Sequence, residues 1–168
     1  ATCGPAAPPT LRAVARGGAK VMLDPQVFER INRSRAFVER LVEEEEVVYG
    51  ITTGFGQFKH VVINKEQTQE LQENLIRSHA TGVGDPLKKD QVRAMVLVRL
   101  NSLLQGYSGV RPVVINRLLQ LLNLDLYPYV PAKGSVGSSG DLAPLSHMIL
   151  VLMGEGELIV DGARTPSA

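Results

Sequence analysis

The sequence predicts a mainly α-helical fold. Apolar residues recur at helical spacing through most of the long stretches between turns, and only one short stretch carries the signature of a β-hairpin. Of the 168 residues, 44% are apolar and 21% are charged, as in a globular protein with a packed core. The formal net charge of +1, without a basic stripe, predicts no nucleic-acid partner, and no apolar run reaches the length of a membrane span.

The first three predicted helices have recognisable starts or stops. A short helix over residues 11–16 ends at Gly17-Gly18. A longer one starts at Asp24-Pro25, where a capping carboxylate precedes a proline, and runs to about residue 45. Asn64 and Gln67 form a capping box for a third helix that ends near residue 80.

The rest of the chain alternates apolar segments with turns. Three more apolar segments predict helices, and these cover residues 92–106, 112–122 and 142–153. Two glycine-rich stretches, residues 47–58 and 127–140, predict ordered loops, and residues 158–162 predict a small hairpin that turns at Asp161-Gly162. The expected organisation is a disordered leader over residues 1–10, one domain over residues 11–162 and a truncated linker over residues 163–168.

The run from Gly134 to Asp141, GSVGSSGD, is the most unusual local sequence. It has neither the lysine of a phosphate-binding loop nor the glycine spacing of a dinucleotide loop. A flexible linker is the simplest alternative, although linkers seldom sit between a proline-rich segment and an apolar helix. In Ser138-Ser139-Gly140, the amide nitrogen of Gly140 can attack the carbonyl carbon of Ser138, because glycine has no Cβ to block the approach. Loss of two waters, one of them from the Ser139 hydroxyl, then leaves an electrophilic methylidene-imidazolone. The N–H groups of the following helix would stabilise the negative charge that develops when a nucleophile adds to it.

Two further side chains are candidates for chemistry. Tyr49 lies among glycines and is either a packed aromatic residue or a general base. His79, near the end of a predicted helix, either interacts with the helix dipole or reads a ligand. His60 and His147 stand alone without the spacing of metal ligands, so no metal site is predicted.

Four segments together resemble the family of aromatic amino-acid ammonia-lyases and aminomutases, with the histidine ammonia-lyases most similar. The segments are VYGITTGFG (48–56), LQENLIRSHATGVG (71–84), GYSG (106–109) and YVPAKGSVGSSGDLAPLSHM (129–148). The resemblance covers about residues 11–160. It implies the N-terminal lobe of the fumarase/aspartase-like fold, with glycine-rich active-site loops.

The resemblance also implies a role for individual residues. Ser138, Ser139 and Gly140 would form the methylidene-imidazolone without an imported cofactor, although family members usually carry alanine at the first position. Asp141 would support this group, and Tyr49 would be the catalytic base. Substrate-pocket positions would be Gly56, His79 and Leu142, with Ser78-His79 selecting the substrate side chain.

The activity implied is that of a carbon–nitrogen lyase, which eliminates ammonia from L-histidine to give trans-urocanate. Tyrosine or phenylalanine ammonia-lyase and aminomutase remain alternatives within the family. Family members are longer and form homotetramers, so we expect this chain to be their N-terminal part and to be inactive alone. It would then be a folding or assembly module whose loop need not cyclise. The chain could be a small binding domain outside the family only if the long match over residues 129–148 arose by chance.

The single cysteine, Cys3, favours a reducing compartment, here the cytoplasm.

Overall fold

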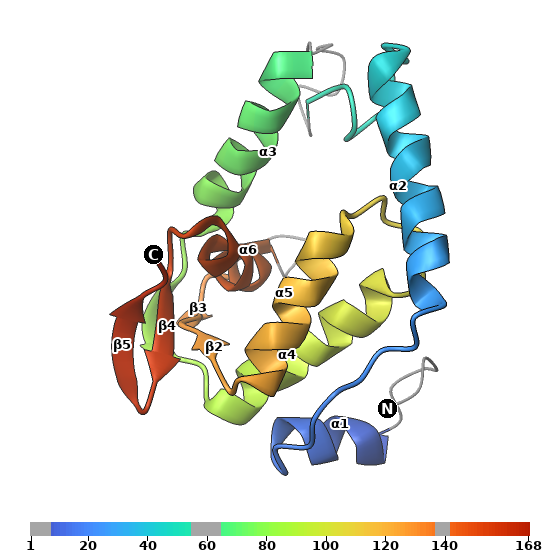
Figure 1. Cartoon of the computed structure of the whole chain (residues 1–168). Helices are drawn as coiled ribbons and strands as arrows, with labels where there is room; N and C mark the ends of the chain where they lie inside the picture. Colours follow the sequence, from blue (N-terminus) through green and yellow to red (C-terminus); the bar gives the residue numbers. More distant parts are fainter. Residues whose placement is uncertain (1–7, 55–64, 137–141) are drawn as a thin grey trace.

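The computed structural model describes residues 8–54, 65–136 and 142–168 (Figure 1). The helices in this part of the chain are α1 (Pro8–Ala15), α2 (Val27–Glu43), α3 (Lys65–His79), α4 (Lys89–Leu103), α5 (Pro112–Asn123) and α6 (Leu142–Leu150). A 3₁₀ turn, Val151–Met153, continues α6. The predicted mainly helical fold is therefore confirmed, and each predicted helix has a counterpart. The predicted capping residue Asn64 lies outside the described residues.

Short strands form two small antiparallel sheets at one side of the helices. In the first, β1 (Val83–Pro86) pairs with β3 (Pro131–Lys133). In the second, β4 (Glu157–Val160) lies between β2 (Tyr127–Pro128) and β5 (Ala163–Pro166). The predicted hairpin is confirmed as β4–β5. Its turn residues Asp161 and Gly162 have φ of 50° and 82°, the left-handed conformation that tight hairpin turns need.

Both predicted ends of the domain are corrected. The first helix begins at Pro8, inside the stretch expected to be a disordered leader, although it stops at Gly17-Gly18 as predicted. The linker expected over residues 163–168 is wrong, because Ala163–Pro166 is the edge strand β5. All four residues of β5 are exposed, so this strand carries no apolar alternation by which the sequence could reveal it.

The core forms around α4, which packs against α1 on one side and α5 on the other (Figure 1). The buried side chains of α4 recur three or four residues apart, as the sequence predicted, and they include Val92, Val96, Leu100 and Leu103. Ile115 and Leu118 of α5 and Met148 of α6 complete the same cluster. On α2, Phe37 is 53% exposed, and the Arg40 guanidinium lies 5.2 Å from the centre of its ring.

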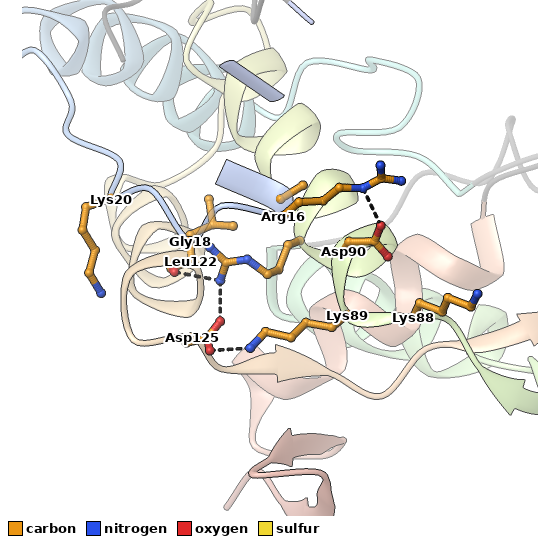
Figure 2. Close-up of a pocket in the computed structure, with 10 residues that line it drawn as sticks. Arg16, Gly18, Lys20, Lys88, Lys89, Asp90, Leu122 and Asp125 are labelled. Carbon is orange, nitrogen blue, oxygen red and sulfur yellow. Dashed lines mark hydrogen bonds and ion pairs between the residues drawn. The ribbon is translucent and has the colours of Figure 1, made fainter. Parts of the chain in front are cut away.

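A buried arginine on α4 joins three helices. The side chain of Arg93 is 3% exposed, and it donates hydrogen bonds to the carbonyl oxygens of Val14 (2.9 Å) and Leu122 (3.0 Å). These carbonyls belong to the last turns of α1 and α5, where no residue of the same helix can satisfy them. Arg93 therefore caps the C-termini of two helices and pairs with Asp125, which Lys89 also contacts (Figure 2). The pocket of about 630 Å³ beside this network is lined by the ion pairs of Arg93 and Lys89 with Asp125 and of Arg16 with Asp90, together with Lys20 and Lys88.

None of the helices in residues 8–54, 65–136 and 142–168 is both long and apolar enough to cross a bilayer.

Candidate functional site

Tyr49 is carried on a tight turn that two buried threonines hold. The Thr52 hydroxyl accepts a hydrogen bond from the Val48 amide at 2.9 Å and donates one to the Glu46 carbonyl. Gly50 adopts φ of 75°, and its amide donates to the Thr53 hydroxyl. The turn is thus fixed from inside, while the Tyr49 side chain is 63% exposed. This arrangement presents the phenol outward and does not fit the alternative of a tyrosine packed into the core of this chain.

His79 is the last residue of α3, and its ring is held by its own helix. Its Nδ1 lies 2.8 Å from the carbonyl oxygen of Leu75 and 3.1 Å from the Ser78 hydroxyl, which donates to the same carbonyl. A carbonyl oxygen only accepts, so the hydrogen-bond network assigns the proton to Nδ1. In the neutral ring, Nε2 is then a hydrogen-bond acceptor. The bond to the Leu75 carbonyl therefore ties the imidazole to the end of its own helix, and Nε2 remains as the nitrogen that a ligand could bind.

The backbone that follows His79 packs against two segments that are far away in the sequence. A Cβ on Gly134 would lie 2.9 Å from the Cα of Gly82 and 3.2 Å from the Cβ of Ala143. Glycine is therefore required by close approach at this point. Gly134 precedes the predicted reactive triplet and Ala143 follows it. Gly82, in the segment after His79, consequently lies against Gly134, which in turn lies close to Ala143, the second residue of α6.

Two more contacts fix the same junction. The amide of Gly82 donates a 2.9 Å hydrogen bond to Nε2 of His147 on α6. Near the end of α3, Arg77 forms an ion pair with Glu155, with Nε 2.9 Å from Oε2. This arginine lowers the pKa of the Glu155 carboxyl below its usual range. No function is predicted from the sequence for His147, Arg77 or Glu155. Their contacts span 65 or 78 residues, so local sequence patterns could not reveal them.

Not all predicted site residues come together. Figure 1 shows the segment of Tyr49 between the end of α2 and the start of α3, whereas His79 ends α3, which packs against α6. α3 has 15 residues and is therefore about 22 Å long. Leu142 is the first residue of α6 and is exposed. Gly56, Ser138, Ser139, Gly140 and Asp141 lie outside the described residues. In the part that the structure describes, no group of three histidine, cysteine or acidic residues could hold a metal ion.

The sequence and the fold of this chain are similar to those of known proteins. The histidine ammonia-lyase of Alkaliphilus metalliredigens is 56% identical over 151 residues, which are 90% of this chain and 30% of that protein. The solved structure of tyrosine aminomutase from Streptomyces globisporus matches with a TM-score of 0.87 and 40% identity over 95% of this chain. Histidine ammonia-lyase from Trypanosoma cruzi matches with a TM-score of 0.83 and 36% identity, also over 95%.

This chain covers only 30% and 31% of those two structures, so it spans about a third of the length of its relatives. The fold is that of the N-terminal part of ammonia-lyases and aminomutases. The sequence profile described as aromatic amino acid lyase matches residues 7–168, almost the whole chain. The chain therefore belongs to the aromatic amino acid lyase family.

Proposed function

We propose that this chain is the part of a histidine ammonia-lyase that carries the reactive group and reads the substrate side chain. The reaction is the elimination of ammonia from L-histidine to give trans-urocanate. The observation that carries the proposal is the position of His79. His79 ends α3 with Nε2 as a hydrogen-bond acceptor, and Gly82, three residues later, lies against Gly134 and His147, which precede and follow the triplet in the sequence. The similarity to the histidine ammonia-lyase of Alkaliphilus metalliredigens gives independent support.

The described residues around the triplet fit a methylidene-imidazolone formed from it. α6 begins at Leu142, two residues after Gly140, and the N–H groups of a first helical turn favour negative charge at the preceding residues. On the other side, the close approach of Gly134 to Gly82 holds the chain just before the triplet. When formed, the group supplies an electrophilic carbon for the amine of the substrate. Asp141 supports it in this proposal.

His79 selects the substrate through hydrogen bonding. Its Nε2 accepts a hydrogen bond from the imidazole N–H of L-histidine, because Nδ1 is already committed to the Leu75 carbonyl. Gly56 and Leu142 belong to the same substrate pocket. The exposed start of α6, where Leu142 lies, is available to a substrate or to another part of the enzyme.

Tyr49 removes the β-proton of the substrate as general base. Its outward presentation on a braced turn supports this role, since a base must reach a substrate outside its own segment. Within one chain, His79 is the last residue of α3, whereas the segment that carries Tyr49 is drawn near the other end of this helix (Figure 1). We therefore propose a homotetramer in which the Tyr49 of one copy serves the triplet of another. The proposal includes a cytoplasmic location, in line with a single cysteine.

Three other activities would use the same parts. A tyrosine lyase or aminomutase is favoured by the 40% identity to tyrosine aminomutase from Streptomyces globisporus, and His79 could also accept a hydrogen bond from a phenol. A phenylalanine lyase is less well supported, because a phenyl ring would leave Nε2 of His79 without a partner.

The test is a chimera that restores a complete enzyme. The present chain replaces the matching 151 residues of the Alkaliphilus metalliredigens protein, and purified chimera is assayed with L-histidine, L-tyrosine and L-phenylalanine. We expect urocanate and ammonia from L-histidine. A β-amino acid product would instead identify an aminomutase, and cinnamate-type products from the other substrates would identify a different lyase. A folded chimera with no turnover would support a module that does not catalyse. The isolated chain, assayed in parallel, is expected to be inactive.

A further inference from the structure

His147 makes a contact that the proposed reaction does not use. It lies on α6, and its Nε2 accepts the hydrogen bond of the Gly82 amide at 2.9 Å. A Cβ on Gly82 would lie 2.9 Å from the same nitrogen and 3.1 Å from the Cβ of Pro131. The ring and the backbone are therefore in direct contact, with no room for a larger residue or a bridging water between them.

This contact ties together two elements of the proposed site. Gly82 comes three residues after His79, and the amide of Ala80 is the last to bond back into α3. From Val83 onward the chain is again fixed, because β1 pairs with β3. Between these two anchors, the hydrogen bond from the Gly82 amide to His147 holds the connecting backbone. α6, which carries His147, is the helix that follows the reactive triplet.

We propose that His147 is a positioning residue: its neutral imidazole fixes Gly82 against α6 and thereby sets the position of His79 relative to this helix, which follows the reactive triplet in the sequence. The meaning of this for catalysis rests on the proposed function, but the positioning itself does not. His147 touches no reacting atom in this account. It acts through the backbone that carries the substrate-reading residue.

The hydrogen bond makes this position sensitive to pH. Nε2 accepts the Gly82 amide only while it is unprotonated, so protonation of His147 sets two N–H groups against each other. Tyr129, Glu155, Glu157 and Arg164 line the cavity of about 460 Å³ beside His147. Arg77 and His79 lie in the last turn of α3, Lys133 lies on β3, and Asp85 is exposed on β1. Glu155 is paired with Arg77 and Glu157 with Arg164, so neither carboxylate is available to stabilise a charged imidazole. Burial lowers the pKa of His147 below its usual 6.5.

Two substitutions of His147 distinguish its role as hydrogen-bond acceptor for the Gly82 amide from its protonation. In His147→Gln, the side-chain amide oxygen can reach the place of Nε2 and accept from Gly82, but it does not titrate. In His147→Leu, a side chain of similar volume remains and the acceptor is lost. The amide of Gly156 lines the same cavity and bonds to the Ser167 hydroxyl, so it is an internal reference that His147 should not affect.

The experiment is nuclear magnetic resonance on the ¹⁵N-labelled 168-residue chain and these two variants. It follows hydrogen exchange of the Gly82 and Gly156 amides and the ring signals of His79 and His147 across pH. We expect Gly82 exchange in His147→Leu to be about tenfold faster than in the parent, after correction for intrinsic rates, which corresponds to about 1.4 kcal/mol. His147→Gln should restore protection. In the parent, Gly82 protection and the His79 ring signals should change together as His147 takes up its proton, and in His147→Gln they should not.

The proposal is overturned if His147→Leu leaves Gly82 exchange and the His79 signals unchanged. It is also overturned if His147→Gln behaves like His147→Leu while Gly156 stays protected in both. Because every readout comes from the chain without turnover, failure of the chimera to make urocanate would refute the proposed function and leave this result standing. Conversely, urocanate formation with no response of Gly82 would refute the positioning role alone.

Discussion

Nδ1 of His79 donates a 2.8 Å hydrogen bond to the carbonyl oxygen of Leu75, one turn earlier in α3. This bond orients the imidazole from within its own helix and leaves Nε2 as an acceptor. Ser78 reinforces it by donating to the same carbonyl at 2.9 Å. A residue held in this way needs no rearrangement to meet a substrate N–H or O–H group.

The first prediction concerns substrate choice. Replacing Ser78-His79 with Phe-Leu in the chimera should move preference from L-histidine towards L-phenylalanine. A buried acceptor without a partner costs about 1–3 kcal/mol, so the ratio of kcat/KM values should change by about 5- to 150-fold. The order in the parent should be L-histidine, then L-tyrosine, then L-phenylalanine. If His79 served only to end its helix, the substitution would lower stability and leave this ratio unchanged, because discrimination is a difference in transition-state binding.

The second prediction concerns Tyr49. In the chimera, Tyr49→Phe should lower turnover of L-histidine by about 10²- to 10⁴-fold, the usual contribution of a general acid or base. The near-ultraviolet absorbance of the methylidene-imidazolone should stay, because the Tyr49 hydroxyl has no part in cyclisation. Tyr107, an exposed tyrosine in the turn between α4 and α5, provides the matched control as Tyr107→Phe. A less than threefold loss for Tyr49→Phe, against that scale, would make Tyr49 a surface residue without a catalytic role.

The third prediction concerns the core of the fold. Arg93→Leu leaves the carbonyl oxygens of Val14 and Leu122 without the donor that caps their helices. Each unsatisfied buried acceptor costs about 1–3 kcal/mol, so the free energy of unfolding should fall by at least about 2 kcal/mol in urea titrations. Arg99→Leu, at an exposed position of the same helix, is the control and should have little effect. Equal losses for both variants would contradict the capping role of Arg93.

The fourth prediction concerns stability against pH. The pKa of His147 is lower in the folded chain than its usual 6.5, because burial disfavours the charged ring. The unfolded chain therefore binds more protons below that value, and the free energy of unfolding should fall as pH drops below about 6.5 and be unaffected above it. Asp125 and Glu155 also have lowered pKa values, but their contributions are lost near or below the usual values of 3.8 and 4.5. In His147→Gln the decline just below pH 6.5 should be smaller than in the parent; an identical decline in both would rule out His147 as its source.

The helices were predictable from the sequence because their signals are local. The apolar faces of α4 and α5 and the stop at Gly17-Gly18 depend on residues a few positions apart. The strands β1, β2 and β3 were missed, since they are two to four residues long and are defined by partners elsewhere in the chain. Phe37 fitted the helical period but lies on the exposed side of α2. The helical period of 3.6 residues shows that a helix has an apolar face, but it does not show which residues at the edge of that face are buried.

The sequence predicted which residues belong to the candidate site, but it did not predict how they are arranged in space. Tyr49 and His79 were found because unusual glycine patterns surround them, and the resemblance to a known family gave them roles. The structure adds how each is held, by Thr52 and by Leu75. The junction of Gly82, Gly134 and His147 was not found, because each residue alone is unremarkable and their meeting depends on the tertiary fold.

The measurement that tests the central claim most directly is the intact mass of the chimera, which reports whether Ser138-Ser139-Gly140 cyclises. The account predicts a mass lower than the sequence mass by two water molecules, with a new near-ultraviolet band, and both should be absent in Ser139→Ala. A folded chimera with the unmodified sequence mass and no such band would contradict the account.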